Sequence, residues 1–427
     1  MGTLTLAGVA VSVAAIGFTV ERLSHNALST HGPFDLSVYM AGARAIRSGS
    51  PLYGPAFAAT SPSHFPFTYP PFAAIALVPL SYLALGQLAW GWDIVSCVVL
   101  GGCVSLAFRP LRRRLGSPVA ALVLTSLALI ARPVYDDLVY GQVDVLLMGA
   151  AVFACASRRS RPGRATLVGL AAAFKVVPGI FIVYLVLARR WRMAWAAAGA
   201  WAAATALGFA LRPGASASYF GRLLWQTGRP GNANSFLNQS MWGVLGRAHL
   251  GRWALPALAL AVGAVVIVGL ARSVRASRRG DAMAAVVLVG LVSVVASPIS
   301  WIHEAVWLVP AAGVLVGDGR LRGLREQGAR FAGLAVAGAA GVAVAGLLAA
   351  GVPYLVSQRL SHGPLAQLVM DTYGIAAAIL ALTGLGRRST AAASTPVPDR
   401  EAAVGEAAEG VSGIAAVDQA PAALRPG

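Results

Sequence analysis

Long apolar runs alternate with short polar segments along most of this chain. A helix needs about 20 apolar residues to span a bilayer, with some tolerance for tilt and for thin membranes. The pattern therefore predicts an all-α fold, a polytopic transmembrane helical bundle with about ten crossings. We place these crossings near residues 3–20, 87–107, 117–132, 142–156, 193–211, 253–271, 281–297, 304–316, 331–350 and 369–385.

The apolar run 165–188 predicts a broken helix pair instead of a further crossing. A single crossing here would place the arginine cluster that follows it on the opposite side of the membrane from all the others. Two short helices, 165–174 and 177–188, that turn around Lys175 and Pro178 avoid this conflict. Interrupted helices inside a bundle often form binding sites, because their open backbone groups need protein or cavity water around them.

The composition agrees with a membrane protein. Hydrophobic residues make up 57% of the 427 residues, charged residues make up 12%, and the mean hydropathy is +0.69. The formal net charge of +18 comes from 33 arginines and one lysine that are dispersed between the apolar runs, which argues against a nucleic-acid partner. Cys97, Cys103 and Cys155 lie inside apolar runs and are interpreted as packing residues.

The distribution of arginine predicts the orientation. Short cytoplasmic loops carry an excess of positive charge, so we expect both termini of this plasma-membrane protein to be cytoplasmic. The first run, 3–20, is interpreted as a retained signal anchor, since no convincing small-residue cleavage site follows it. Of the 33 arginines, 21 fall into six clusters, within residues 109–114, 158–164, 189–192, 272–279, 320–330 and 387–388.

Two parts are expected along the chain, a transmembrane domain at 1–386 and a cytoplasmic tail at 387–427. The tail is rich in Ala, Pro and Glu and has almost no aromatic residues, which predicts disorder. The long polar segments fall on the outer face, where we expect the functional residues. These segments are 21–71, 133–141, 212–252, 298–303 and 351–368.

Two short helical elements are predicted at the outer face. Residues 36–48 form an amphipathic pattern, with Val38, Met40 and Ile46 toward lipid or protein. The run 72–85 follows a double proline and is too short to cross, so it should pack at the same face.

Asp35 is the leading candidate for chemistry. It is the one carboxylate in the outer segment after Glu21. The structural interpretation is that Asp35 is the N-cap of the predicted helix 36–48. The functional interpretation is a general base at the membrane surface, and we favour it because Asp35 stands alone.

His303 is the second candidate, in a turn that follows Pro298 and contains Trp301. A proline before such a turn leaves backbone groups open near a cavity. The alternative is a histidine that caps the helix 304–316 or lies in the interfacial aromatic belt. Glu304 beside it favours function, because two ionisable groups at a membrane boundary are costly unless they are used.

Lys175 lies in the middle of an apolar run. Intramembrane cations usually face the interior of the bundle, so a site is the default interpretation, and a phosphate is the obvious ligand. The alternative is a side chain that extends to the outer interface.

The acids Asp136, Asp137 and Asp144 are close in sequence. Adjacent acids can begin a metal site, but no histidine or further carboxylate follows at ligand spacing, so we expect no metal. Gln142, Asp137 and Asp144 are instead predicted to form hydrogen bonds with sugar hydroxyls.

The segment 212–252 adds further candidates for binding a sugar or a phosphate. Arg222 and Arg229 suit a phosphate, and Asn238 suits a sugar hydroxyl. The same residue types are common in any solvated loop.

Five segments resemble, in order, the landmarks of glycosyltransferase family 87, and the resemblance covers about residues 1–386. Asp144 departs from the pattern, since an asparagine is expected after the Gly-Gln pair. The segments are Phe34-Asp35-Leu36-Ser37-Val38-Tyr39, Phe67-Thr68-Tyr69-Pro70-Pro71-Phe72, Gly141-Gln142-Val143-Asp144, Phe174-Lys175-Val176-Val177-Pro178 and Ser297-Pro298-Ile299-Ser300-Trp301-Ile302-His303.

The resemblance implies a GT-C fold with a catalytic aspartate in the first outer loop. It also implies an enzyme that moves mannose from a polyprenyl-phosphate-mannose donor to a mannoside, glycolipid or lipoglycan acceptor at the outer face, with inversion and an α-1,2 linkage. A sugar on a phosphate is already activated, so one base, Asp35 with His303 as its partner, suffices without any cofactor. We expect Lys175, Arg222, Arg229 and Tyr69 to bind the donor, and Gln142, Asp144, Asp137, Trp301, Glu304 and Asn238 to bind the acceptor.

Two other functions stay open at this point. A polyprenyl-phosphate arabinofuranosyltransferase would use a similar scaffold. An assay with each labelled donor would distinguish it from a mannosyltransferase. A transporter or flippase of a lipid-linked sugar should show related halves and midplane polar residues. No internal repeat is visible, and the ionisable residues concentrate at the outer ends of helices, which favours an enzyme.

Overall fold

The computed structural model describes residues 2–27, 32–115, 119–157, 161–229, 231–248, 251–317 and 369–385. Within these ranges the structure is helical, and the β-structure is limited to one isolated bridge between Asn238 and Trp301. The described residues belong to one compact unit, residues 1–387. The boundary predicted at 386 and the tail lie outside them.

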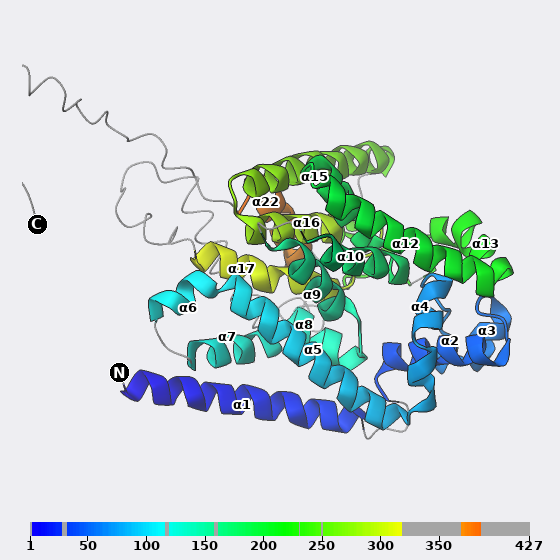
Figure 1. Cartoon of the computed structure of the whole chain (residues 1–427), viewed down its shortest axis with the longest axis horizontal. Coiled ribbons are helices and arrows are strands. Elements are labelled where there is room, and N and C mark those ends of the chain that lie inside the picture. Colours follow the sequence, from blue (N-terminus) through cyan, green and yellow to red (C-terminus); the bar gives the residue numbers. More distant parts are fainter. Residues whose placement is uncertain are drawn as a thin grey trace, which may run out of the picture. The chain divides into compact units, whose positions relative to one another are not determined.

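The elements follow one another as a series of helices with short connections (Figure 1). The 3-10 helices are η1 (Pro62–His64), η2 (Val78–Tyr82), η3 (Val177–Gly179), η4 (Leu223–Trp225), η5 (Gly251–Trp253) and η6 (Ile302–Trp307). The α-helices are α1 (Gly2–Ala27), α2 (Phe34–Ser48), α3 (Pro55–Thr60), α4 (Pro71–Ala76), α5 (Leu85–Ala107), α6 (Arg109–Leu115), α7 (Val119–Leu129), α8 (Arg132–Tyr140), α9 (Asp144–Cys155), α10 (Pro162–Phe174), α11 (Ile180–Leu187), α12 (Trp191–Leu211), α13 (Pro213–Gly221), α14 (Met241–Arg247), α15 (Ala254–Arg278), α16 (Ala282–Ala296), α17 (Leu308–Gly317) and α22 (Thr372–Thr383).

Among the described residues, three helices are long and apolar enough to cross a membrane, namely α5, α12 and α15. A fourth candidate is the pair α7 and α8, which is bent by 70°. The apolar helices α9, α11, α16, α17 and α22 are shorter, because turns and 3-10 segments interrupt the runs. The ten predicted crossings are therefore not confirmed, and the predicted crossing 331–350 lies outside the described residues.

The predicted break in the run 165–188 is confirmed. Helix α10 ends at Phe174, Lys175 has an extended backbone, and η3 and α11 follow. Helix α10 packs closely on α12 through Gly169, where an added Cβ would lie 2.1 Å from the carbonyl oxygen of Ala197. Small residues permit such close helix contacts in membrane proteins. The break therefore leaves Lys175 at the end of a firmly packed helix.

Helix α16 lies at the centre of the main hydrophobic core and is buried on all sides from Ala284 to Val295. It packs against α9, α11, α15, α17 and α22. Its Gly290 accommodates the indole of Trp307 in η6, since an added Cβ would lie 2.0 Å from Trp307 Cδ2. Phe181 stacks on the same indole with ring centroids 5.5 Å apart. This packing fixes η6, which carries His303 and Glu304.

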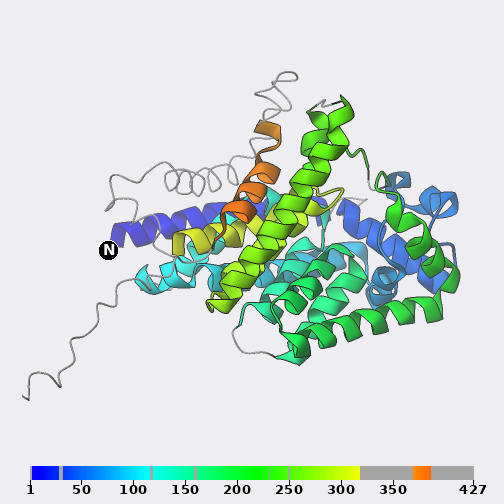
Figure 2. The same ribbon diagram turned by 90° about the horizontal axis from the view of Figure 1, so that it is seen from above.

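Helix α2 corresponds to the predicted amphipathic helix 36–48 but begins two residues earlier. Its apolar residues Val38 and Met40 are buried, and the helix packs against α4 and η2, which form the predicted outer-face run. Figures 1 and 2 show α2, α3 and α4 (blue) beside α13 (green). Because the N-cap of α2 is Pro33, Asp35 lies inside the first turn and is not the N-cap.

Candidate active site

Two adjoining cavities lie where α2, η6 and the connections after α8 and α10 meet. The first cavity has a volume of about 190 Å³, and its wall includes Lys175, Tyr219 and Arg229. The second cavity has a volume of about 260 Å³ and a more aromatic wall that includes Phe34 and Tyr140. The two cavities share five wall residues, which are Asp35, Phe65, Gln142, Trp301 and His303.

The first turn of α2 and the end of α8 bring Asp35 and Gln142 together. Helix α8 ends at Tyr140 and is capped by Gly141, whose φ of +67° lies in the left-handed region that favours glycine. A Cβ on Gly141 would lie 2.7 Å from Leu36 Cβ and 2.9 Å from Pro33 Cβ. A larger residue at position 141 would therefore push Gln142 away from Asp35.

The Gln142 side chain is oriented by two tyrosines. Its Oε1 accepts a hydrogen bond from Tyr39 Oη at 2.7 Å and a longer one from Tyr69 Oη at 3.4 Å. The two tyrosine hydroxyls also lie 2.9 Å apart. Since the amide oxygen is engaged by hydroxyl donors, the amide nitrogen is left to donate to Asp35.

The half-buried Asp35 carboxyl is set up to exchange a proton near neutral pH. Burial raises the pKa of Asp35 to about 7. The hydrogen bond from Gln142 and the charge of Lys175 lower it, whereas the charge of Asp144 adds to the increase. A carboxylate with a pKa close to the working pH is well suited to general base catalysis.

Lys175 is held by two carboxylates. Its Nζ lies 2.8 Å from Asp144 Oδ1 and 3.0 Å from Glu304 Oε1. Glu304 Oε2 also accepts a hydrogen bond from Ser300 Oγ at 2.9 Å. One positive charge thus faces two negative charges, so this cluster is not a strongly cationic site. The alternative that Lys175 extends to the interface is wrong, because its side chain is only 14% exposed.

His303 is buried beside this cluster and lines both cavities. Its Nε2 lies 3.7 Å from Asp144 Oδ2. The structure therefore brings the sequence candidates Asp35, His303, Glu304 and Lys175 to one place, with Trp301 and Tyr69 in the same walls.

Asp144, His303 and Glu304 each offer a ligand atom, and these atoms lie within 4.8 Å of one another, as in a metal site. The ammonium group of Lys175, however, contacts both carboxylates of this group. A divalent ion at the same point would have to displace an internal cation. The donor set therefore fits a metal poorly, and the absence of a metal stays a prediction.

Arg229 is the cation of the first cavity that faces no acid. Its Nη2 donates to Phe67 O at 2.8 Å, and its guanidinium lies 5.6 Å from the ring centre of Tyr53. Among the residues that the structure describes, no carboxylate lies within 4 Å of it. Arg222, by contrast, is exposed and lies outside the walls of both cavities.

Asp137 and its neighbour Asp136 do not converge on one point. Asp137 is fully buried, and its Oδ1 accepts the backbone N–H groups of Asp144 at 3.0 Å and Val145 at 3.2 Å. It therefore caps the start of α9 and is not in a cavity wall. Asp136 pairs with Arg132 at 2.9 Å. The sugar contact of Asp137 stays a prediction that this geometry does not support.

Asn238 is also fully buried, with its side chain engaged by the backbone. Its Oδ1 accepts from Ser240 N at 3.1 Å and from Ser300 N at 2.9 Å. Its Nδ2 donates to Ala233 O at 2.8 Å and to Pro298 O at 3.3 Å. This geometry gives Asn238 a role in holding two loops together, so its predicted sugar contact also lacks support.

The sequence interpretation missed two residues that orient the site. Tyr39 was detectable, since it follows Asp35 by four residues and so lies on the same face of α2. Ser300 gave no signal, because its contact with Glu304 depends on the 3-10 turn of η6.

Comparison with known proteins gives consistent results. A sequence model of glycosyltransferase family 87 matches residues 67–298. A polyprenol-phosphate-mannose-dependent alpha-(1-2)-phosphatidylinositol mannoside mannosyltransferase of Mycobacterium tuberculosis is 32% identical over 343 residues, which cover 76% of this chain and 78% of that protein. A polyprenol-phosphate-mannose-dependent alpha-(1-2)-phosphatidylinositol pentamannoside mannosyltransferase of M. tuberculosis is 34% identical over 339 residues. These residues cover 77% of this chain and 76% of that protein.

Among solved structures, the chain is similar to ArnT from Cupriavidus metallidurans bound to undecaprenyl phosphate. The TM-score is 0.41 and the sequence identity is 17%, over 87% of this chain and 77% of that one. This similarity is too low to assign a fold.

Proposed function

Because the chain belongs to glycosyltransferase family 87, we propose that this integral membrane enzyme transfers mannose from a polyprenyl-phosphate-mannose donor to a mannoside of a glycolipid acceptor. The names of its mycobacterial relatives support this donor and an α-1,2 linkage. The GT-C architecture is proposed on the same basis.

One observation carries the mechanism, namely the half-buried carboxyl of Asp35 in the wall shared by two cavities. A donor in one cavity and an acceptor in the other would meet at this carboxyl. Asp35 takes the proton of the acceptor hydroxyl, the oxygen bonds to the anomeric carbon, and the bond from that carbon to the phosphate oxygen breaks. The electron pair leaves with the lipid phosphate, and a single displacement inverts the anomeric configuration.

The first cavity is assigned to the donor because Arg229 lies in its wall. A departing phosphate needs a cation whose charge is not already neutralised. The charge of Lys175 is offset by two carboxylates, which makes Arg229 the better partner. Lys175 then keeps Asp144 and Glu304 in place, with one remaining N–H for the sugar or the phosphate.

The second cavity is assigned to the acceptor sugar. Its wall combines the aromatic residues Phe34, Tyr140 and Trp301 with the carboxylate of Asp136. Aromatic faces and hydrogen-bond acceptors suit the apolar and hydroxyl surfaces of a mannoside. His303, in the shared wall, is proposed to assist Asp35 or to contact the phosphate oxygen.

The reaction is proposed to occur at the outer face of the plasma membrane. The support is that the site lies at the start of α9, whereas the arginine cluster 109–113 follows the far end of α5. The arginines of 189–192 likewise lie at the start of α12, whose other end lies near α2 because Arg212 donates to Ala45 O. Positive clusters mark the cytoplasmic side.

The test is transfer by the purified enzyme in detergent from a labelled polyprenyl-phosphate-mannose to a mannoside acceptor. Wild-type enzyme should form a mannosylated product, and Asp35→Asn should abolish it while the protein still folds. Replacing His303 by Ala should reduce the rate by about a hundredfold, the usual scale for a positioned proton-transfer group. Transfer from the arabinofuranose donor alone, or no product in detergent, would refute the proposal in favour of the other two functions.

A further inference from the structure

We propose that Arg247 and Asp371 form a buried positioning pair that holds the segment 297–304 in the geometry needed for transfer. This inference rests on the proposed function. The segment carries Trp301 and His303 of the shared wall and Glu304 of the lysine cluster. Arg247 and Asp371 themselves lie outside both walls.

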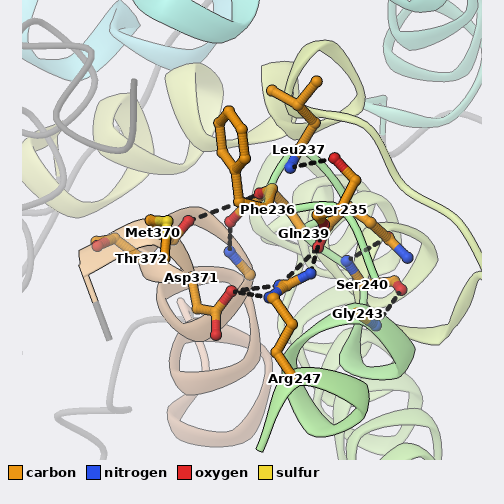
Figure 3. Close-up of polar contacts among 12 residues, drawn as sticks. Ser235, Phe236, Leu237, Gln239, Ser240, Gly243, Arg247, Met370, Asp371 and Thr372 are labelled. Atoms are coloured by element: carbon orange, nitrogen blue, oxygen red, sulfur yellow. Dashed lines mark hydrogen bonds and ion pairs between the residues drawn. The ribbon is translucent and has the colours of Figure 1, made fainter. Parts of the chain in front are cut away.

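The guanidinium of Arg247, at the end of α14, connects three pieces of chain (Figure 3). Its Nε donates to Asp371 Oδ1 at 3.1 Å, and its Nη2 contacts the same oxygen. Nη2 also donates to Asn238 O at 2.9 Å, and Nη1 donates to Ser235 O. The planar fork of donors suits such a geometry better than a lysine would.

The loop held by Arg247 is bonded in turn to the segment 297–304. Asn238 Oδ1 accepts from Ser300 N at 2.9 Å, and Gln239 N donates to Ser300 O at 2.6 Å. Ser240 Oγ donates to Pro298 O at 3.1 Å. These contacts surround Ser300, whose hydroxyl donates to Glu304. A shift of the loop would therefore move Glu304 and its neighbours.

The start of α22 supports the same loop from the other side (Figure 3). Gln239 Nε2 donates to Met370 O at 2.8 Å, and Gln239 Oε1 accepts from Gly374 N at 3.1 Å. A Cβ on Gly374 would lie 2.1 Å from Gln239 O, so the contact requires glycine. Asp371 thus lies between Met370, just before α22, and Gly374, inside it, and both residues are hydrogen-bonded to the loop.

A role in stability alone would not require these residues. Apolar residues of similar volume often replace a buried ion pair without loss of stability. Such residues cannot reproduce the directed bonds from Arg247 to Ser235 O and Asn238 O. We therefore interpret the pair as holding the loop in position through its charge and its directed hydrogen bonds.

The experiment compares full-length enzyme carrying Arg247→Lys with the double variant Arg247→Met/Asp371→Leu. For each protein, kcat, the KM for the donor and the thermal midpoint in detergent are measured. We expect both variants to unfold near the wild-type temperature, with kcat reduced by about a hundredfold, the scale for misplaced reacting groups. The KM for the donor should change much less than kcat, because Arg229, the proposed partner of the donor phosphate, lies outside the segment 297–304.

Arg272→Lys is the matched control. Arg272 Nη1 donates to Thr383 O at 2.7 Å, at the opposite end of α22, so its replacement should leave kcat unchanged. Wild-type kcat in the folded double variant would overturn the proposal, and so would a double variant that fails to fold, because the pair would then be structural. If the wild-type enzyme itself transfers no mannose, the proposed function fails and not the pair.

Discussion

Replacing Gln142 by methionine should move the pH dependence of transfer upward. The Gln142 amide donates to the Asp35 carboxylate and so stabilises its ionised form. A hydrogen bond to a charged group contributes about 1.5 to 3 kcal/mol. At 1.36 kcal/mol per pH unit, its loss should raise the pKa of Asp35 by roughly one to two pH units. The wild-type value is about 7.

The substitution is expected to leave the fold intact. Tyr39 and Tyr69 lose their shared acceptor but remain within 2.9 Å of each other, and the Trp92 indole donates to the backbone oxygen of Gln142 at 2.8 Å. Methionine has nearly the volume of glutamine and no buried polar group to satisfy.

The assay is the pH profile of kcat/KM for the purified enzyme in detergent. The base must be ionised, so the wild-type rate should fall as the pH decreases through about 7. In Gln142→Met the same decrease should occur at higher pH, with much of the rate recovered under alkaline conditions. Gln226→Met, in the wall of the first cavity, should keep the wild-type profile. An unchanged midpoint with a lower plateau would show that Gln142 does not act on the charge of Asp35.

Three further predictions follow from the packing and the charges. Lys175→Met leaves two buried carboxylates unpaired and should cost about 3 to 5 kcal/mol of stability, measured by thermal or denaturant unfolding; an unchanged midpoint would refute the pairing. Chelation by EDTA should not reduce transfer, because the ammonium already contacts both acids, and activity restored by added Mg²⁺ or Mn²⁺ would contradict this. Gly290→Ala should cost about 1 to 3 kcal/mol by overpacking against Trp307, whereas Gly263→Ala, with nothing within 4 Å of the new Cβ, should not destabilise.

The helical class and the broken helix at Lys175 could be predicted from the sequence, because apolar runs are a local signal and the arginine cluster after residue 188 argues against a single crossing. The number of crossings could not. The apolar run 117–132 ends in a bend of 70° between α7 and α8, at the extended backbone of Ala131 before Pro133, and α9 is only Asp144–Cys155. Run length alone does not distinguish a span from a short buried helix.

The site residues that could be predicted from the sequence are those whose residue type is rare in its surroundings. Asp35, Lys175 and His303 are unusual in their surroundings, and all three line the first cavity. Asp137 and Asn238 looked equally suitable by residue type. Their side chains satisfy backbone groups instead, a use that depends on which chain segments meet in space. Ordinary residues such as Arg247 gave no signal for the same reason.

The common wall of Asp35, Gln142 and His303 also bears on inhibitor design. A phosphonate joined to a mannoside by a short uncharged bridge would reach past this wall and fill both chambers at once. Linking the two halves makes the second contact intramolecular, so the joined compound should bind far more tightly than an equimolar mixture of its fragments.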